Sequence, residues 1–322
     1  MNGRKLLVLK ARPRNPESRA TLEGEASPAD VILVSGYNPR PKKDDNQVRT
    51  GYDMGVLADK LGCDVYSFVR SEGDSDRPQR VENEEHPDQV SLTQLHQAKA
   101  EENLGAIEQL RSDGDLTDNP LDIMGFSDGR IVTMVMLNER PDLFKNFVIT
   151  NTPGLDNASA SRSYLQALRE LGHLGSHAIL QKLGRGRERY GPQTKLAFTR
   201  DASDGYEDST YKSNARFDSS AIARTKSLLK FLPQILEKNP DIRGYIASTE
   251  ADRIAPAQQV ENALKEIPTG GRIQSRHTGW ETHTMGYGTT ERAQKLGNQG
   301  DLLLELRMKP SVSISSSLGK SA

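Results

Sequence analysis

The chain has 322 residues, of which 34% are hydrophobic and 27% charged, with a net charge of −1 and a mean hydropathy of −0.67. This length suits one large α/β domain or two modest ones, and the near-neutral charge gives no global attraction for nucleic acid or anionic membranes. No apolar stretch approaches the roughly 18–20 residues of a membrane span, and the single cysteine, Cys63, excludes an intramolecular disulfide and a cysteine-based zinc cluster.

The first residues are basic, but the apolar run of residues 6–9 is too short for a signal peptide, and Lys10 interrupts it. We therefore expect a cytoplasmic protein. Cys63 stands at the start of an apolar run, where we expect a small core residue.

Short apolar, β-branched runs bounded by turn residues predict buried strands along the chain. Between them, apolar residues recur at helical spacing. The strand runs are residues 31–34, 65–69, 121–124, 147–150, 245–247 and 273–275, and the helical segments are residues 52–61, 95–110, 130–137 and 256–267. Because strands alternate with helices, we predict an α/β fold with a mostly parallel, doubly wound sheet covered on both faces.

The alternation stops after Gly154, and no strand-like run follows before Ile242. The helical patterns in this interval predict a helical cap at residues 155–230, inserted between two core segments, residues 1–154 and 231–308. Its end stays open, because the helical pattern of residues 222–236 fits either part. Residues 309–322 are serine-rich without periodicity, which predicts a flexible tail.

A serine lies between two glycines in residues 125–129, Gly-Phe-Ser-Asp-Gly, directly after the strand run 121–124. A nucleophilic serine on a sharp strand-to-helix turn has a strained backbone, and flanking glycines remove the Cβ atoms that would collide there. The same pattern is typical of an ordinary strand-to-helix turn, because glycine and serine are common turn residues. Ser127 is therefore a candidate nucleophile, and the rest of the sequence must supply the base and the acid that a nucleophilic serine needs.

A serine hydroxyl attacks efficiently only when a base takes its proton and a carboxylate orients that base. In an open parallel sheet such side chains converge at the carboxyl ends of the strands. Asp252 follows one predicted strand, with Glu250 in reserve. Two histidines follow the last predicted strand: His277 lies near its end, and His283 lies beyond a glycine-containing loop.

The order serine, aspartate, histidine, together with the glycine-flanked serine, resembles the α/β-hydrolase superfamily. The resemblance covers most of residues 30–155 and 240–307. Three further motifs resemble those of the family: Ser35-Gly36-Tyr37, residues 70–78 and Arg140-Pro141-Asp142. In the first of them, Ser35 replaces the family's usual histidine.

This resemblance implies a cap-bearing serine hydrolase with Ser127 as nucleophile, Asp252 as orienting acid and His283 as base. The family's histidine usually follows a loop, which favours His283 over His277. The backbone amides of Tyr37 and Asp128 are implied to form the oxyanion hole, and both residues border the substrate.

The carboxylate of Asp128 poses a question, because a negative charge close to a developing oxyanion disfavours it. One solution is internal, with Arg130 or Arg40 supplying the positive charge. The other is a cationic substrate, because the Gly-x-Ser-Asp-Gly sequence resembles valacyclovir hydrolase-like members, whose aspartate recognises an amino group. Those members have glycine where this chain has Arg130.

No phosphate-binding glycine loop is present and the remaining histidines are scattered, so we expect neither a cofactor nor a metal. The basic run of residues 182–190 is expected to be a solvated loop. We predict hydrolysis of an ester or related acyl bond of a small molecule, with no nucleic acid and no membrane as partner. The alternatives are a slow-turnover or non-catalytic ligand-binding protein, and a C–C bond hydrolase or perhydrolase on the same scaffold. The oligomeric state stays open.

Overall fold

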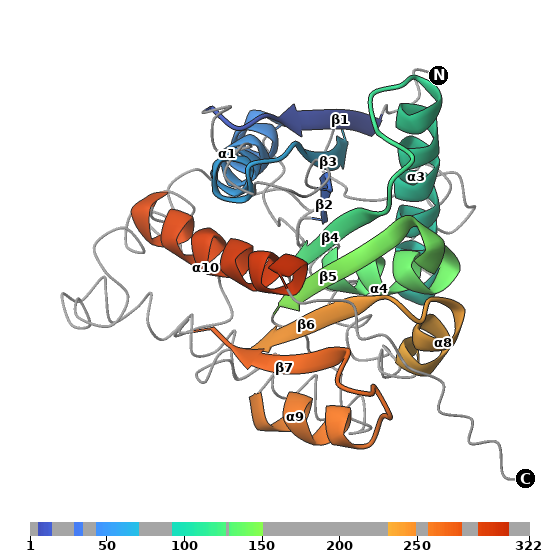
Figure 1. Cartoon of the computed structure of the whole chain (residues 1–322). Helices are drawn as coiled ribbons and strands as arrows, with labels where there is room; N and C mark the ends of the chain where they lie inside the picture. The colour runs from blue at the N-terminus through green and yellow to red at the C-terminus, as the bar shows by residue number, and fades with distance from the viewer. Residues whose placement is uncertain are drawn as a thin grey trace, which may run out of the picture.

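The computed structural model describes residues 6–14, 29–34, 43–70, 92–126, 129–150, 231–248, 257–278 and 289–308. Seven strands in these residues form one sheet in the order β1-β3-β2-β4-β5-β6-β7, shown in Figure 1. Strand β1 runs antiparallel to β3, and every other neighbouring pair is parallel. The strands are β1 Leu6–Ala11, β2 Val31–Val34, β3 Val65–Arg70, β4 Leu121–Phe126, β5 Phe144–Thr150, β6 Arg243–Ser248 and β7 Ile273–His277.

The sheet confirms the predicted α/β class and each of the six predicted strands. The helices are α1 Lys43–Leu61, α3 Leu92–Ser112, α4 Gly129–Glu139, α8 Phe231–Lys238, α9 Ala257–Lys265 and α10 Thr289–Met308. None of these helices is long and apolar enough to cross a membrane. The predicted cap at residues 155–230 and the predicted tail at residues 309–322 lie outside the described residues.

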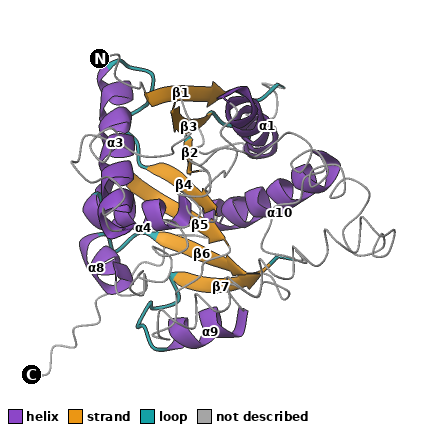
Figure 2. Ribbon diagram, turned by 180° about the vertical axis from the view of Figure 1, so that it is seen from behind, coloured by secondary structure: helices purple, strands orange, loops and turns teal. Residues whose placement is uncertain are grey.

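Successive side chains of a strand point to opposite faces of the sheet, so each strand contributes to both layers of helices. In β2, Val31 and Leu33 belong to the apolar cluster that includes α1 and α10, whereas Ile32 and Val34 belong to the cluster that includes α3, α4, α8 and α9. Figures 1 and 2 show α1 and α10 on one side of the sheet and α3, α4 and α8 on the other. Cys63 is buried in the α1 and α10 layer, as predicted.

Two elements were not predicted, and both have weak patterns. Strand β1 is an edge strand whose Val8 is 41% exposed, and its apolar residues raised only the question of a signal peptide. Helix α10 buries Leu296 and Leu303, but it also buries the polar Gln299, which blurs the apolar stripe that marks a surface helix.

An ion pair between the fully buried Asp122 and the largely buried Arg307 anchors α10 to the sheet. Asp122 of β4 has no exposed surface, and it accepts a hydrogen bond from Arg307 Nε at 2.7 Å and one from Asn146 Nδ2 at 2.8 Å. Arg307 Nη2 also donates to the carbonyl of Ala29 at 2.6 Å. Burial raises the pKa of the Asp122 carboxyl from its ordinary value, and the charge of Arg307 opposes that rise.

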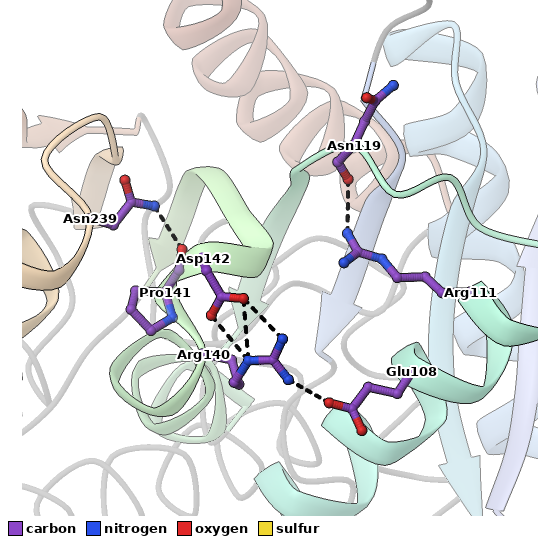
Figure 3. Close-up of polar contacts among 7 residues, drawn as sticks. All are labelled: Glu108, Arg111, Asn119, Arg140, Pro141, Asp142 and Asn239. Carbon is purple, nitrogen blue, oxygen red and sulfur yellow. Dashed lines mark hydrogen bonds and ion pairs between the residues drawn. The ribbon is translucent and has the colours of Figure 1, made fainter.

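The Arg140-Pro141-Asp142 motif lies at the exposed junction between α4 and β5 (Figure 3). Arg140 Nη2 donates to Asp142 Oδ2 at 2.9 Å and its Nη1 contacts Glu108 of α3, while Asn239 Nδ2 donates to the carbonyl of Pro141 at 2.7 Å. These bonds tie α3, α4 and the end of α8 together. Because the charges are exposed, each ion pair contributes little, about 0–1 kcal/mol.

The buried pair and the surface network predict losses of very different size when their arginine is replaced. Arg307→Met leaves the Asp122 charge buried without its cation, so we expect the free energy of unfolding to fall by about 3–5 kcal/mol. Urea denaturation followed by circular dichroism measures the loss. Arg140→Ala is the matched control, with an expected loss below about 1 kcal/mol.

The deficit of Arg307→Met should also depend on pH. Without the arginine the pKa of Asp122 in the folded state rises further, so the folded protein holds this proton more tightly than the unfolded chain does. Stability of the variant then falls as the pH rises above the ordinary value of 3.8, and it falls further than that of the wild type, in which Arg307 opposes the rise in pKa, so the deficit grows with pH. A loss below about 1 kcal/mol at pH 7 would contradict the role assigned to the pair.

Candidate functional site

Strands β2, β4, β5, β6 and β7 are parallel, so their carboxyl ends lie along one edge of the sheet. The predicted site residues follow these ends in the sequence. Tyr37 comes three residues after β2, Ser127 one residue after β4, Asp252 four residues after β6 and His283 six residues after β7. An open α/β sheet binds its ligand at this edge.

All five predicted site residues lie outside the described residues, and so do the alternatives Glu250 and Arg40. The five are Ser127, Asp128, Tyr37, Asp252 and His283. Strand β4 ends at Phe126 and helix α4 begins at Gly129, so Ser127 and Asp128 are the two residues that connect a strand to a helix. Ser127 as nucleophile stays a prediction at this connection.

The first glycine of the motif is required by close packing between β4 and α4. A Cβ atom added at Gly125 would lie 2.8 Å from the backbone Cα of Arg130 and would also collide with the Oγ1 of Thr133. Thr133 is itself held by a hydrogen bond from its hydroxyl to the carbonyl of Gly129 at 2.9 Å. Helix α4 therefore passes so close to β4 that only glycine fits at residue 125.

Arg130 places a buried positive charge immediately beyond the connection. It is 2% exposed, and its Nη1 donates to the carbonyl of Thr150 at 3.4 Å, at the carboxyl end of β5. Phe126 and Thr150 are register partners, so the guanidinium lies at the edge where β4 and β5 end. Asp128 is two residues away along the chain, which limits the distance between its Cα and that of Arg130 to about 7 Å.

His277 is the last residue of β7, and its Nε2 lies 2.7 Å from Glu261 Oε1 of α9. The register runs from Phe126 through Thr150 and Ala247 to Arg276, so β7 lies three strands away from β4. Three strand spacings are about 14 Å, longer than a histidine side chain. The position of His277 on the strand, and its bond to Glu261, disfavour it as the base for Ser127.

Several residues near this edge were not singled out from the sequence. Thr278 donates from its backbone N to the carbonyl of Ser248 at 2.9 Å, and Glu261 bonds His277. The hydroxyls of Thr150 and Ser248 are buried without a hydrogen bond in the part of the chain that the structure describes. Glu261 and Thr278 carry no sequence signal, because each role depends on a residue that only the sheet register brings near. In the described residues, no group of three or more His, Cys, Asp or Glu side chains is arranged to hold a metal ion.

The contact at Gly125 predicts opposite effects for two glycine-to-alanine substitutions. Gly125→Ala forces α4 away from β4, so we expect a loss of about 1–3 kcal/mol in the free energy of unfolding. Gly105→Ala, in α3, meets no atom within 4 Å and should stabilise the helix by about 0.5–1 kcal/mol. Thermal unfolding of both variants checks the pair. Equal stability of Gly125→Ala and the wild type would show that the packing is not this close.

Comparison with solved structures shows the same architecture at low sequence identity. A serine hydrolase from Cycloclasticus zankles has a TM-score of 0.55 and 13% identity, covering 96% of this chain and 99% of its own. A probable hydrolytic enzyme from Pseudomonas aeruginosa PAO1 has a TM-score of 0.55 and 14% identity, covering 95% and 94%. The enol-lactonase from Burkholderia xenovorans LB400 has a TM-score of 0.52 and 14% identity, covering 96% and 98%.

No protein-family model matches the chain, and no curated protein matches it in sequence. The likeness to solved structures extends over nearly the whole chain and includes one that is itself named an α/β hydrolase, from a deep-sea metagenome, with a TM-score of 0.50 and 13% identity. The mostly parallel seven-stranded sheet of the described residues, with helices on both faces, is an architecture of the α/β class. The chain therefore has the α/β-hydrolase fold.

Proposed function

We propose that this protein is a serine hydrolase that cleaves an ester or a related acyl bond of a small molecule. The observation that carries the proposal is the close approach of α4 to β4 at Gly125, two residues before Ser127. An ordinary turn does not need a helix so near its strand, whereas a nucleophile elbow does. The solved structures reported above are hydrolases by name, which supports the same class of reaction.

In the proposed reaction the Oγ of Ser127 attacks the acyl carbon while His283 takes the hydroxyl proton. Asp252 orients the imidazole and stabilises its charged form. The backbone amides of Tyr37 and Asp128 bind the oxyanion of the tetrahedral intermediate. The leaving alcohol takes the proton from His283. A water molecule, deprotonated by the same histidine, then attacks the acyl carbon, and His283 returns that proton to the Oγ of Ser127 as the acid leaves.

The geometry of β7 supports His283 over His277 as the base. His277 is held on the strand and bonded to Glu261, about 14 Å to the side of β4. His283 follows six residues later, and a segment of that length spans up to about 20 Å. The chain can therefore carry His283, and not His277, back to the carboxyl end of β4.

The buried Arg130 supports a substrate with a neutral acyl group over one that carries an amine. A cation already lies within reach of Asp128, so that carboxylate does not need one from the substrate. At about 4 Å and an effective dielectric of 20, two unit charges interact by roughly 4 kcal/mol. An internal pair of this strength competes directly with recognition of a substrate amine.

Substitution of the proposed nucleophile tests the mechanism. Ser127→Ala should abolish labelling by a fluorophosphonate probe and lower turnover of p-nitrophenyl acetate by about 10⁴-fold or more, because no other hydroxyl replaces it. His283→Ala should show a comparable loss and His277→Ala a much smaller one. An unchanged melting temperature checks that the variants fold. Labelling that survives in Ser127→Ala would place the nucleophile elsewhere.

Substrate charge gives a second prediction. Between p-nitrophenyl butyrate and the p-nitrophenyl ester of valine, the wild type should favour the neutral butyrate by at least about tenfold in kcat/KM, because Arg130 repels the ammonium group. Arg130→Met should shift this ratio toward the amine. A wild-type preference for the valine ester would instead support recognition of the amine by Asp128.

A further inference from the structure

Two segments carry Asp252 and His283, and three described elements adjoin them. Strand β6 ends at Ser248, helix α9 begins at Ala257, and strand β7 ends at His277. The segment between β6 and α9 contains Asp252, and the segment between β7 and α10 contains His283. The contacts among these three ends therefore fix the chain on both sides of the proposed acid and just before the proposed base.

Two bonds hold the end of β7 against the end of β6. Thr278 donates from its backbone N to the carbonyl of Ser248 at 2.9 Å and from its hydroxyl to the same oxygen at 3.4 Å. Ser248 and His277 are register partners. The last strand pairing thus extends one residue past β7, to the point where the segment with His283 begins.

The bond between His277 and Glu261 adds α9 to this junction. His277 lies on the same face of β7 as Ile273, and Ile273 packs in the same apolar cluster as Val260 and Leu264 of α9. This packing brings Glu261 to His277, with Nε2 and Oε1 2.7 Å apart. Figure 1 shows α9 alongside β7, which is the outermost strand of the sheet. The segment with Asp252 is then held at both of its ends.

The pair of Glu261 and His277 is too exposed to contribute much to the free energy of unfolding. The side chain of His277 is 49% exposed and that of Glu261 is 32% exposed. Pairs this accessible to solvent add about 0–1 kcal/mol to the free energy of unfolding. A catalytic constellation, in contrast, must be held within about 0.5 Å of its productive geometry, so a weak bond at this position has a large effect on rate.

We propose that Glu261 and His277 are positioning residues that hold the segments carrying Asp252 and His283 in register with each other. The inference rests on the proposed function, because it assigns the pair a role in that reaction. Neither residue contacts the substrate. Glu261 acts through the start of α9 on the segment with Asp252, and His277 acts through Thr278 on the segment with His283.

Substitutions of Glu261 test the proposal with p-nitrophenyl acetate as substrate. Glu261→Ala should lower kcat by about tenfold or more with KM changed less than about twofold, because the triad shifts while the acyl pocket does not. Glu261→Gln keeps an oxygen that accepts from His277 and should restore most of the activity. The matched control is Asn262→Ala, the next residue of α9, which bonds only Gln258 in the described structure.

A second measurement does not depend on catalysis. The Thr278 amide bonds the Ser248 carbonyl, so its hydrogen exchange reports whether the junction is closed. Exchange at this amide should be faster in Glu261→Ala than in Asn262→Ala, with the melting temperatures of both within about 2 °C of the wild type.

The outcomes separate the two proposals. Wild-type turnover with normal labelling at Ser127, and a Glu261→Ala kcat equal to that of Asn262→Ala, would overturn the positioning role alone. Equal exchange at Thr278 in the two variants would also overturn it. Absence of fluorophosphonate labelling at Ser127 in the wild type would overturn the proposed function, and the positioning role with it.

Discussion

The buried carboxylate of Asp122 is the constraint on which the arrangement of this protein depends. A charge with no exposed surface needs a cation and hydrogen bonds, and the cation comes from Arg307, 185 residues further along the chain. Meeting this need lays α10 across the sheet and brings the last described helix to the start of the central strand β4. The same arginine bonds the carbonyl of Ala29 just before β2, so one side chain joins three distant parts of the sequence.

The ion pair of Asp122 and Arg307 and the proposed nucleophile lie at opposite ends of strand β4. Asp122 lies at the amino end of β4, where its pairing with Arg307 stabilises the fold. Ser127 follows the carboxyl end of the same strand. Arg307 holds the carboxyl end of α10 to β4, and Thr278 holds the residue that follows β7 against the end of β6.

Electrostatics at the carboxyl edge links the packing to the proposed substrate. Arg130 is buried because α4 begins two residues after the serine and lies close against β4. The same close packing that requires glycine at residue 125 therefore buries a positive charge two residues beyond Asp128 in the sequence. At the end of β7, Glu261 and His277 form a pair that is partly exposed and adds little stability. We propose that the buried charge favours a neutral substrate and that the exposed pair aligns the segments with the proposed acid and base.

Strand positions could be predicted where apolar residues form a nearly continuous run, as in β2 and β4, because burial on both faces of the sheet requires such runs. The prediction missed β1 and α10, whose patterns are weak because one lies at an edge and the other buries the polar Gln299. The glycine-flanked serine was also visible, since the turn it occupies demands glycine locally.

The sequence by itself determined the α/β class, the strand runs and the candidate residues Ser127, Asp252 and His283, because each follows from local pattern and order along the chain. Only the tertiary structure decided that Arg307 neutralises Asp122, that Arg130 is buried and that His277 bonds Glu261. Those contacts depend on the register of the sheet and on the packing of helices from distant parts of the chain. No local pattern specifies which distant side chain will fill a given position.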